Sequence, residues 1–472
     1  MRLSSARFVS TFIILILVGA VLGQQSPDAQ LGATDAGKRI VQYFQAFNEP
    51  DEQKLRSFFE NNIAAASLAE RPVEPRLAFH KQVKSDFGKI VVDSVVAVTP
   101  DEIKVVGRSA NGSMISYSFQ ISPTDGKIVG LTIEPDGPRN APPPPPPLSA
   151  PKTVAELPAA IRDLFDSAAR DGRFSGVVLV AKDGVPNFNK AWGMAAVDKS
   201  LPNRLDTKFN LGSINKLFTR IAIGQLVKAG KLSFSSKLID VLPDYPNKTI
   251  AAKITIGQMI TMTSGLGDFF NDDFVSSDHS KIRSLRDYLP LFANIPLEFE
   301  PGTKSRYSNA GYLVLGLVIE KLSGGSYYDY VRKNVFELAG MSDTDSYEID
   351  KLPANTAIGY MKKGSASPLT PNVGALPGRG SSAGGGYSTA PDLLRLAKAL
   401  KEGKLVVPKD DGTFPTTFES TGIAGGSEGV NALFLTNAAS GCTVIVLSNL
   451  DPPSATQPGT QVRDWIKQLT PQ

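Results

Sequence analysis

Six consecutive prolines at 142–147 are the feature that most limits how this chain can fold. Proline has no backbone N–H and a fixed φ, so the run cannot join a helix or a sheet ladder and favours an extended polyproline conformation. We therefore expect residues 139–153 to be a semi-rigid linker between two separately folded blocks. The alternative interpretation of the same residues is a docking motif for a proline-binding partner.

The first residues have the pattern of a cleavable export signal. Two arginines precede an apolar core at 8–22, and the small residues Val21 and Gly23 stand before Gln24. This pattern predicts a signal peptide at 1–23 and a periplasmic or extracellular location in a bacterial cell, with no stable membrane span after cleavage. An uncleaved anchor is the alternative, although the apolar run is short for one.

Composition excludes some classes of protein. A length of 472 residues suggests two or three domains, and a hydrophobic content of 42% suits globular domains with apolar cores. The formal net charge is +4, and the sequence has no dense basic run with interleaved aromatic residues. We therefore expect no nucleic-acid partner. The only cysteine, Cys442, cannot form an internal disulfide, and we expect it to be a small core residue in a buried strand.

Residues 30–138 have the pattern of a small α+β domain. Apolar periodicity predicts helices at 36–48 and 55–68, and alternating residues predict four strands after them. The strands are expected at 89–99, 102–110, 113–122 and 127–135. This element order resembles cone-shaped domains of the nuclear-transport-factor-2-like (NTF2-like) kind. The block has no cluster of catalytic residue types, and its lone histidine, His80, is expected to be structural.

Residues 154–472 have the pattern of a larger domain in which strands from both ends meet. A helix at 157–172 is followed by a hairpin that turns at Asp183-Gly184, and two further strands lie within 429–450 before a closing helix at 461–469. We expect these strands to form one antiparallel sheet with helices from the middle of the block packed on it. The predicted fold class is therefore α/β (α+β).

The stretch at 209–227 places Ser213 and Lys216 in an otherwise apolar sequence. Its spacing predicts a helix that is buried nearly all round, with Ser213 at the N-terminus and Lys216 one turn further on the same side. A buried lysine tends to lose its proton, and a neutral lysine beside a hydroxyl is a general base beside a nucleophile. The alternative is that Ser213 is only an N-cap and Lys216 a surface residue. The pattern also occurs at Ser149–Lys152, where no helix organises it.

Several motifs follow one another in the order of a known superfamily. Ser213 and Lys216 form Ser-x-x-Lys, Tyr307 and Asn309 form Tyr-x-Asn, and a glycine-rich strand follows. With the segments TMTSGL, PGTKSRYSN and AGGGYSTAPDLLRLAKAL, this order resembles the serine β-lactamase and penicillin-binding-protein superfamily, in particular its class C-like hydrolases and esterases. The resemblance spans residues 155–470. It implies a β-lactamase/transpeptidase-like fold, an antiparallel sheet flanked by helices plus a helical subdomain.

The resemblance implies a role for each motif residue. Ser213 is the expected nucleophile and Lys216 takes or relays its proton. Tyr307 is the expected partner base in acylation and proton donor to the leaving group. Asn309 would orient Lys216 and hydrogen-bond the substrate. The implied chemistry is hydrolysis of an ester, amide or β-lactam bond in a small-molecule or peptide substrate, with no cofactor and no metal.

Two further inferences concern the oxyanion and the absence of a histidine base. The resemblance implies that the backbone N–H groups of Ser213 and Gly426, with Gly425 beside them, bind the oxyanion and the substrate. The chain has only two histidines, His80 in the other block and His279 in a polar stretch, so a Ser-His-Asp triad is poorly supplied.

One departure from the superfamily bears on the substrate. Its third motif begins with lysine or histidine, whereas this chain has Ile423, then Ala424 and Gly425. The resemblance implies that this cation holds a substrate carboxylate, which Ile423 cannot do. We therefore favour an esterase-like activity over penicillin hydrolysis. The alternative is a catalytically weak or inactive binding or scaffold protein that keeps the fold. The oligomeric state is not indicated by the sequence.

Overall fold

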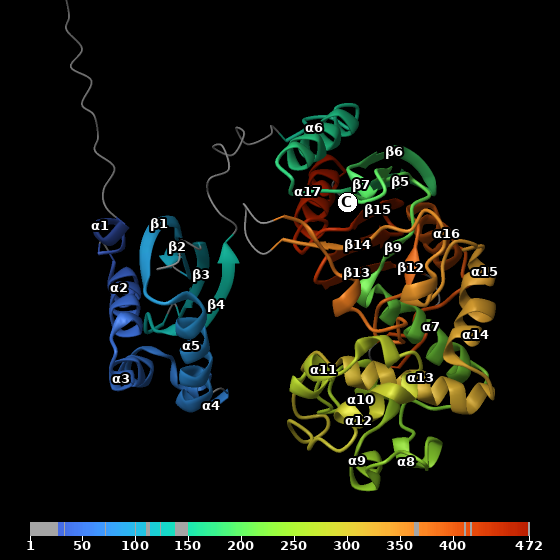
Figure 1. Cartoon of the computed structure of the whole chain (residues 1–472), viewed down its shortest axis with the longest axis horizontal. Coiled ribbons are helices and arrows are strands. Elements are labelled where there is room, and N and C mark those ends of the chain that lie inside the picture. The colour runs from blue at the N-terminus through green and yellow to red at the C-terminus, as the bar shows by residue number, and fades with distance from the viewer. Residues whose placement is uncertain are drawn as a thin grey trace, which may run out of the picture. The chain divides into compact units, whose positions relative to one another are not determined.

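The computed structural model describes residues 27–470. Its gaps are at 33, 71, 100, 110–113, 123, 137–149, 363–367, 410–411 and 416–417. The chain divides into two units, Met1–Asn140 and Ala141–Gln472, and each is described by itself (Figure 1). The predicted signal peptide and the proline run lie outside the described residues, so both stay predictions. In the described part, no helix combines the length and hydropathy needed to cross a membrane.

The first unit consists of helices followed by a four-stranded antiparallel sheet in the order β1-β2-β3-β4. The helices are α1 (Pro27–Leu31), α2 (Asp35–Asn48), α3 (Glu52–Asn62), α4 (Ala65–Glu70) and α5 (Val73–Phe87). The strands are β1 (Ile90–Val98), β2 (Glu102–Ser109), β3 (Met114–Ile121) and β4 (Ile128–Asp136). His80 on α5 is buried in the aromatic core, with its ring centroid 4.9 Å from that of Phe59. The likeness of this unit to NTF2-like domains stays a prediction.

The helices of this unit differ from the sequence expectation in two ways. A single helix over 55–68 is wrong, because the chain is extended at Ile63, which bridges to Ile128 of β4 and separates α3 from α4. Helix α5 was not expected. Its residues that pack on the core, Val73, Leu77, His80, Val83 and Phe87, are helically spaced, but the polar His80 interrupts the apolar pattern, so hydrophobic periodicity gives little signal for it.

The second unit is built on a five-stranded antiparallel sheet in the order β13-β14-β15-β5-β6. The strands are β5 (Gly176–Lys182), β6 (Val185–Trp192), β13 (Ser420–Ser427), β14 (Val430–Asn437) and β15 (Cys442–Ser448). Val178 of β5 lies opposite Val446 of β15, so strands from both ends of the unit join one sheet and the predicted fold class is confirmed. Cys442 is half-buried at the start of β15 and packs at the margin of the core cluster on one face of the sheet.

Both faces of this sheet are covered, which explains the apolar run of β5. Val178 and Val180 pack in a cluster with α6 (Leu157–Arg170) and α17 (Thr456–Leu469). The alternate residues Val177 and Leu179 belong to the larger core on the opposite face, where α16 (Ala390–Lys401) contacts the sheet. A strand buried on both faces needs apolar residues at every position, not at alternate ones.

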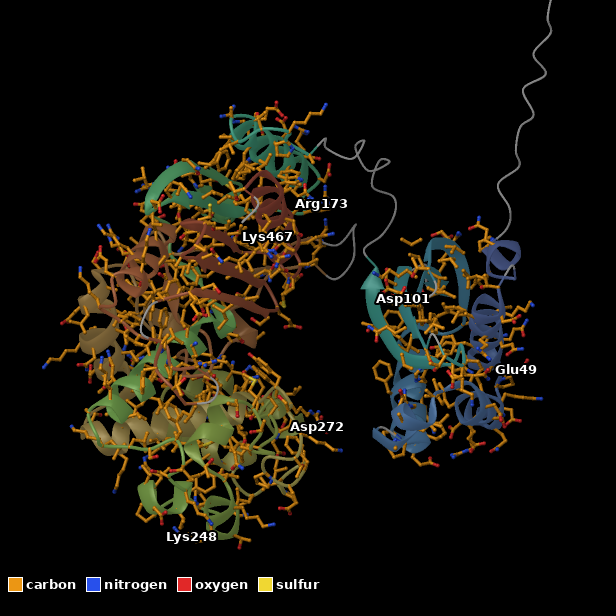
Figure 2. All side chains as sticks on the ribbon, turned by 180° about the vertical axis from the view of Figure 1, so that it is seen from behind. Glu49, Asp101, Arg173, Lys248, Asp272 and Lys467 are labelled. Carbon is orange, nitrogen blue, oxygen red and sulfur yellow. The ribbon has the colours of Figure 1, made fainter. Side chains whose placement is uncertain are left out.

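The middle of the chain forms a helical region beside the sheet (Figure 1). Its helices are α7 (Asn215–Lys228), α8 (Leu238–Val241), α9 (Lys248–Lys253), α10 (Ile256–Ile260), α11 (Asp272–Ser276), α12 (Leu289–Phe292), α13 (Asn309–Ser323), α14 (Tyr327–Val331) and α15 (Glu337–Ala339). Helices α7 and α13 pack together and are buried on most sides, as their apolar sequences predict. Charged side chains such as Lys248 and Asp272 lie at the outer surface of this region (Figure 2).

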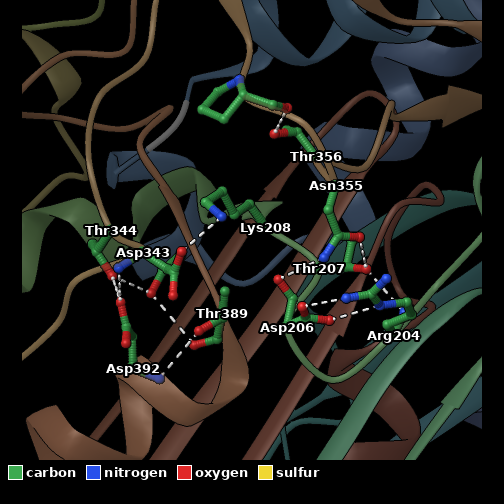
Figure 3. Close-up of polar contacts among 12 residues, drawn as sticks. Arg204, Asp206, Thr207, Lys208, Asp343, Thr344, Asn355, Thr356, Thr389 and Asp392 are labelled. Atoms are coloured by element: carbon green, nitrogen blue, oxygen red, sulfur yellow. Dashed lines mark hydrogen bonds and ion pairs between the residues drawn. The ribbon is translucent and has the colours of Figure 1, made fainter.

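Residues 207–208, which precede Ser213, are bonded to residues 343 and 355, more than 130 positions later (Figure 3). Lys208 pairs with Asp343, Nζ to Oδ1 2.8 Å, and Thr207 Oγ1 donates to Asn355 Oδ1 over 2.8 Å. Asn355 has φ 60°, a conformation that asparagine adopts more readily than most residues. These contacts fix the start of β9 (Phe209–Asn210), and Ser213 follows directly after it.

Candidate active site

The structure brings four predicted side chains into contact. Ser213 Oγ lies 2.5 Å from the Tyr307 hydroxyl and 3.2 Å from Lys216 Nζ. Lys216 Nζ donates to Asn309 Oδ1 over 2.6 Å. Lys216 is only 2% exposed, whereas Tyr307 is 50% exposed. The serine therefore lies near the surface with its neighbouring amine buried beneath it.

Local structure explains how these residues meet. Ser213 lies in a 3₁₀ turn, η1 (Gly212–Ile214), that runs into α7. It was expected at the helix N-terminus, and it lies just before the first α-helical residue, Asn215. Lys216 follows one turn later on the same side. Asn309 is the first residue of α13, and Ser308 caps that helix by accepting a hydrogen bond from Gly311 N. The packing of α13 on α7 places Asn309 beside Lys216.

The surroundings of Lys216 favour a neutral amine. Burial lowers the pKa of Lys216 from 10.5 to about 7, and the negative charge of Asp268 partly opposes this shift. Its Nζ donates to Asn309 Oδ1 and to the Ala383 carbonyl oxygen, each over 2.6 Å. A neutral amine has two N–H groups and one lone pair, and these two acceptors use both N–H groups. The lone pair is then left for the Ser213 hydroxyl, which is the arrangement of a general base.

The surroundings of Tyr307 keep its phenol protonated. Burial raises the pKa of Tyr307, the hydrogen bond with Ser213 lowers it, and the negative charge of Asp268 raises it. A protonated phenol at 2.5 Å from Ser213 Oγ is a proton donor. Of the two roles expected for Tyr307, the geometry therefore favours donation to the leaving group over base catalysis.

The two predicted glycines lie on β13, an edge strand, against the turn that carries Ser213. A β-carbon on Gly425 would lie 1.9 Å from the Leu211 carbonyl oxygen and 2.9 Å from Ser213 N. A β-carbon on Gly212, which has φ +50°, would lie 2.8 Å from Gly426 N. Only glycine permits this approach of β13 to the turn, in which Gly425 lies beside Ser213 N and Gly212 lies beside Gly426 N. The oxyanion-binding role of these amides stays a prediction.

Two groups at the site were missed by sequence reasoning. Asp268 Oδ2 accepts a hydrogen bond from Asn309 Nδ2 over 2.6 Å, and the Ala383 carbonyl oxygen accepts from Lys216. A backbone carbonyl leaves no trace in residue identity. For Asp268, the sequence offered only its position two residues after the segment TSGL. That segment supported the resemblance, but none of its residues was expected to take part in the chemistry.

The remaining singled-out residues lie apart from these groups. His279 stacks on Phe274, with ring centroids 4.2 Å apart, and its Nε2 lies 2.8 Å from the Phe274 carbonyl oxygen. Ile423 of β13 lies opposite Phe434 and packs against the hydrophobic core. Its side chain is uncharged. In the part of the chain that the structure describes, no cluster of three or more His, Cys, Asp or Glu side chains is arranged to hold a metal ion.

Comparison with known proteins gives consistent matches for the second unit. Residues 161–464 match the family model described as Beta-lactamase. Penicillin-binding protein 4* of Bacillus subtilis (strain 168) is 33% identical over 189 residues, 40% of this chain and 41% of that protein. Esterase EstB of Burkholderia gladioli is 30% identical over 289 residues, 54% of this chain and 73% of that protein. A penicillin binding protein from Bacillus halodurans has a TM-score of 0.56 at 31% identity, over 66% of this chain and 99% of that chain.

The extent of these matches differs between relatives. The chain spans only about two fifths of the length of penicillin-binding protein 4*, but nearly all of the B. halodurans structure. The range that matches the family model, 161–464, contains the positions of Ser213, Lys216, Tyr307 and Asn309 and begins after the first unit.

Proposed function

Because the chain belongs to the beta-lactamase family, we propose that it is an exported serine hydrolase that forms an acyl-serine intermediate and acts on uncharged esters. The observation that carries this proposal is the contact of Ser213 with a buried lysine whose two N–H groups are already used. Export is supported by the residues before Gln24, and N-terminal sequencing of the processed protein tests it. A protein that kept residues 1–23 would contradict cleavage.

The proposed reaction follows from the geometry of the site. Lys216 Nζ takes the Ser213 proton while Oγ bonds to the carbonyl carbon of the substrate. The amides of Ser213 and Gly426 stabilise the oxyanion, and losing one such donor typically costs about 2.7–4 kcal/mol in the barrier. As the bond to the leaving oxygen breaks, Tyr307 protonates that oxygen, and the proton held by Lys216 restores the phenol. Water then attacks the acyl carbon and gives a proton to Lys216, the bond from the acyl carbon to Oγ breaks, and the pair returns that proton to Ser213 Oγ.

The preference for uncharged substrates rests on charge at the site. Ile423 supplies no cation on β13, and Asp268 places a carboxylate behind Asn309. A substrate carboxylate would therefore gain no cation from position 423, and the negative charge behind Asn309 would disfavour it through space. EstB is named an esterase, which agrees with this preference without establishing it.

We expect p-nitrophenyl butyrate to be turned over and a penicillin to acylate the protein slowly or not at all. Steady-state ester hydrolysis and intact-mass measurement of the penicillin adduct check both halves. Ile423→Lys should increase penicillin acylation relative to ester turnover, whereas Ile423→Met, of similar size and uncharged, should not. Rapid penicillin hydrolysis without ester turnover would contradict the substrate assignment. If neither compound nor a fluorophosphonate reacts with the folded protein, the binding-protein alternative suggested by Ile423 is correct.

The pH profile of wild-type kcat/KM is the second prediction. The reaction needs neutral Lys216, whose pKa is about 7, so kcat/KM should rise with pH and level off above that value. The pKa of Tyr307 is raised, so loss of its proton should lower the rate only at strongly alkaline pH. Ester hydrolysis measured between pH 5 and pH 10 checks this expectation. A rate that stays flat from pH 5 to pH 9 would exclude Lys216 as the base.

A further inference from the structure

Asp268 has no part in the proposed reaction steps, yet it ends a series of hydrogen-bonded contacts that starts at Ser213. Lys216 contacts Ser213 Oγ and donates to Asn309 Oδ1, and Asn309 Nδ2 donates to Asp268 Oδ2 over 2.6 Å. The other carboxylate oxygen of Asp268 accepts from Phe270 N over 3.2 Å. Both carboxylate oxygens are therefore occupied by donors, and the side chain is held in one orientation.

These hydrogen bonds fix the orientation of the Asn309 side-chain amide. A carboxylate accepts hydrogen bonds and cannot donate them, so Asp268 must face the amide nitrogen of Asn309. The amide oxygen then faces Lys216, which needs an acceptor for one N–H. With the amide reversed, two acceptors would meet at Asp268, and Asn309 Nδ2 would face Lys216, where it would meet an N–H or take the lone pair that Ser213 needs. Without the Asp268 carboxylate, the repulsion between acceptors that opposes the reversal is lost.

The backbone around Asp268 is fixed to the segment that carries Tyr307 and Asn309. Ser308 Oγ donates to the Gly267 carbonyl oxygen over 2.9 Å, and Arg306 N donates to the Met262 carbonyl oxygen over 2.9 Å. Asp268 is thus held beside Asn309 by backbone contacts as well as by its own side chain.

We propose that Asp268 is a positioning residue: it fixes the Asn309 amide and thereby directs the Lys216 lone pair at Ser213. This inference rests on the proposed function, since positioning a base matters only if Ser213 reacts. It assigns to Asp268 no contact with the substrate.

The charge of Asp268 gives this role a measurable signature. Among the described residues, it is the carboxylate whose charge raises the pKa of Lys216 against the effect of burial. The rings of Tyr307 and Tyr312 face Lys216 Nζ, with centroids 4.7 and 5.6 Å away. The other titratable side chains of α7, α13, α14 and η4 (Arg332–Phe336) do not contribute to the pKa shift of Lys216; they are Arg220, Lys228, Glu320, Lys321, Tyr327, Tyr328, Asp329, Tyr330, Arg332 and Lys333. Strand β13 and residues 380–386 carry no titratable side chain. Removing the Asp268 charge should therefore lower the pKa of Lys216.

Asp268→Asn keeps the shape of the side chain but removes its charge and adds a donor. We expect kcat/KM to fall by about 10- to 100-fold because Asn309 loses its fixed orientation. The acid limb, the pH range over which kcat/KM rises to its plateau, should shift to lower pH by about one unit. Asp272→Asn, on the outer surface of α11, is the matched control and should leave both the rate and the limb unchanged.

The exchanged double variant Asp268→Asn/Asn309→Asp separates positioning from a general structural role. It returns an acceptor-only group to Lys216 and places the carboxylate next to Nζ, so the acid limb should move above the wild-type value. The rate of Ser213 labelling by a fluorophosphonate, followed against pH, is the readout. The proposal is supported if the acid limb lies at lower pH than the wild type in Asp268→Asn and at higher pH in the double variant. An unmoved limb in Asp268→Asn overturns it, and if that variant does not fold, an unmoved limb in the double variant overturns it. Failure of the wild-type protein to be labelled refutes the proposed function instead.

Discussion

Ser213→Ala should reduce ester hydrolysis to the uncatalysed background, a loss on the order of 10⁴-fold or more. Alanine removes the oxygen that forms the acyl bond, and neither Tyr307 nor Lys216 can replace it as a nucleophile while the phenol is protonated and the amine is buried. The substitution removes a half-buried hydroxyl and no packing group, so the unfolding temperature should stay close to that of the wild type. Stopped assays with purified protein, alongside a thermal melt, measure both quantities.

Ser149→Ala is the matched control for this experiment. Ser149 belongs to the other Ser-x-x-Lys sequence in the chain, which lies in the proline-rich stretch. Its substitution should leave turnover unchanged. Wild-type turnover by Ser213→Ala would remove the basis of the proposed mechanism.

Lys216→Met should lower kcat/KM by about 10³-fold, within the range that a general base contributes. Methionine fills the buried space but cannot take the Ser213 proton. Since the two residues act as a unit, Ser213→Ala/Lys216→Met should be no slower than Ser213→Ala alone. Kinetics of the two single variants and the double variant test this non-additivity. Additive losses would mean that Lys216 contributes independently of Ser213.

Lys216→Met also has an expected effect on stability, with a defined sign. The pKa of Lys216 falls from 10.5 when unfolded to about 7 when folded, so between these values the unfolded state binds more protons. The free energy of unfolding of the wild type should therefore rise relative to that of Lys216→Met as pH increases from 7 to 10. Denaturant unfolding at several pH values measures this difference. Lys228→Met, at the exposed end of the same helix, should show no such trend.

Much of the second unit follows from local patterns in the sequence. The hairpin turn at Asp183-Gly184 forms as predicted, because both residues adopt positive φ, 51° and 78°. Apolar periodicity locates α7 and α13, and the Ser-x-x-Lys spacing places Lys216 one turn after Ser213; these features depend on residues close together in the chain. That Tyr307 and Asn309, more than ninety residues later, lie beside them was implied by the resemblance to the superfamily.

The parts that could not be predicted depend on tertiary contacts. The break between α3 and α4 arises because Ile63 bridges to Ile128, more than sixty residues later. The acceptor at Ala383 is a main-chain atom, and Asp268 gains its place only when residues 262–268 pack on the segment before α13. The low pKa of Lys216 likewise comes from burial by several elements and not from its sequence neighbours.

The most direct test of the account is to locate the site of acylation. The wild-type protein is treated with a fluorophosphonate near pH 8, its intact mass is measured, and the digested protein is mapped by peptide mass spectrometry. One adduct per chain is expected, on Ser213; it should be absent from Ser213→Ala and form slowly in Lys216→Met. An adduct on any other residue, or a folded protein that stays unlabelled, would contradict this expectation.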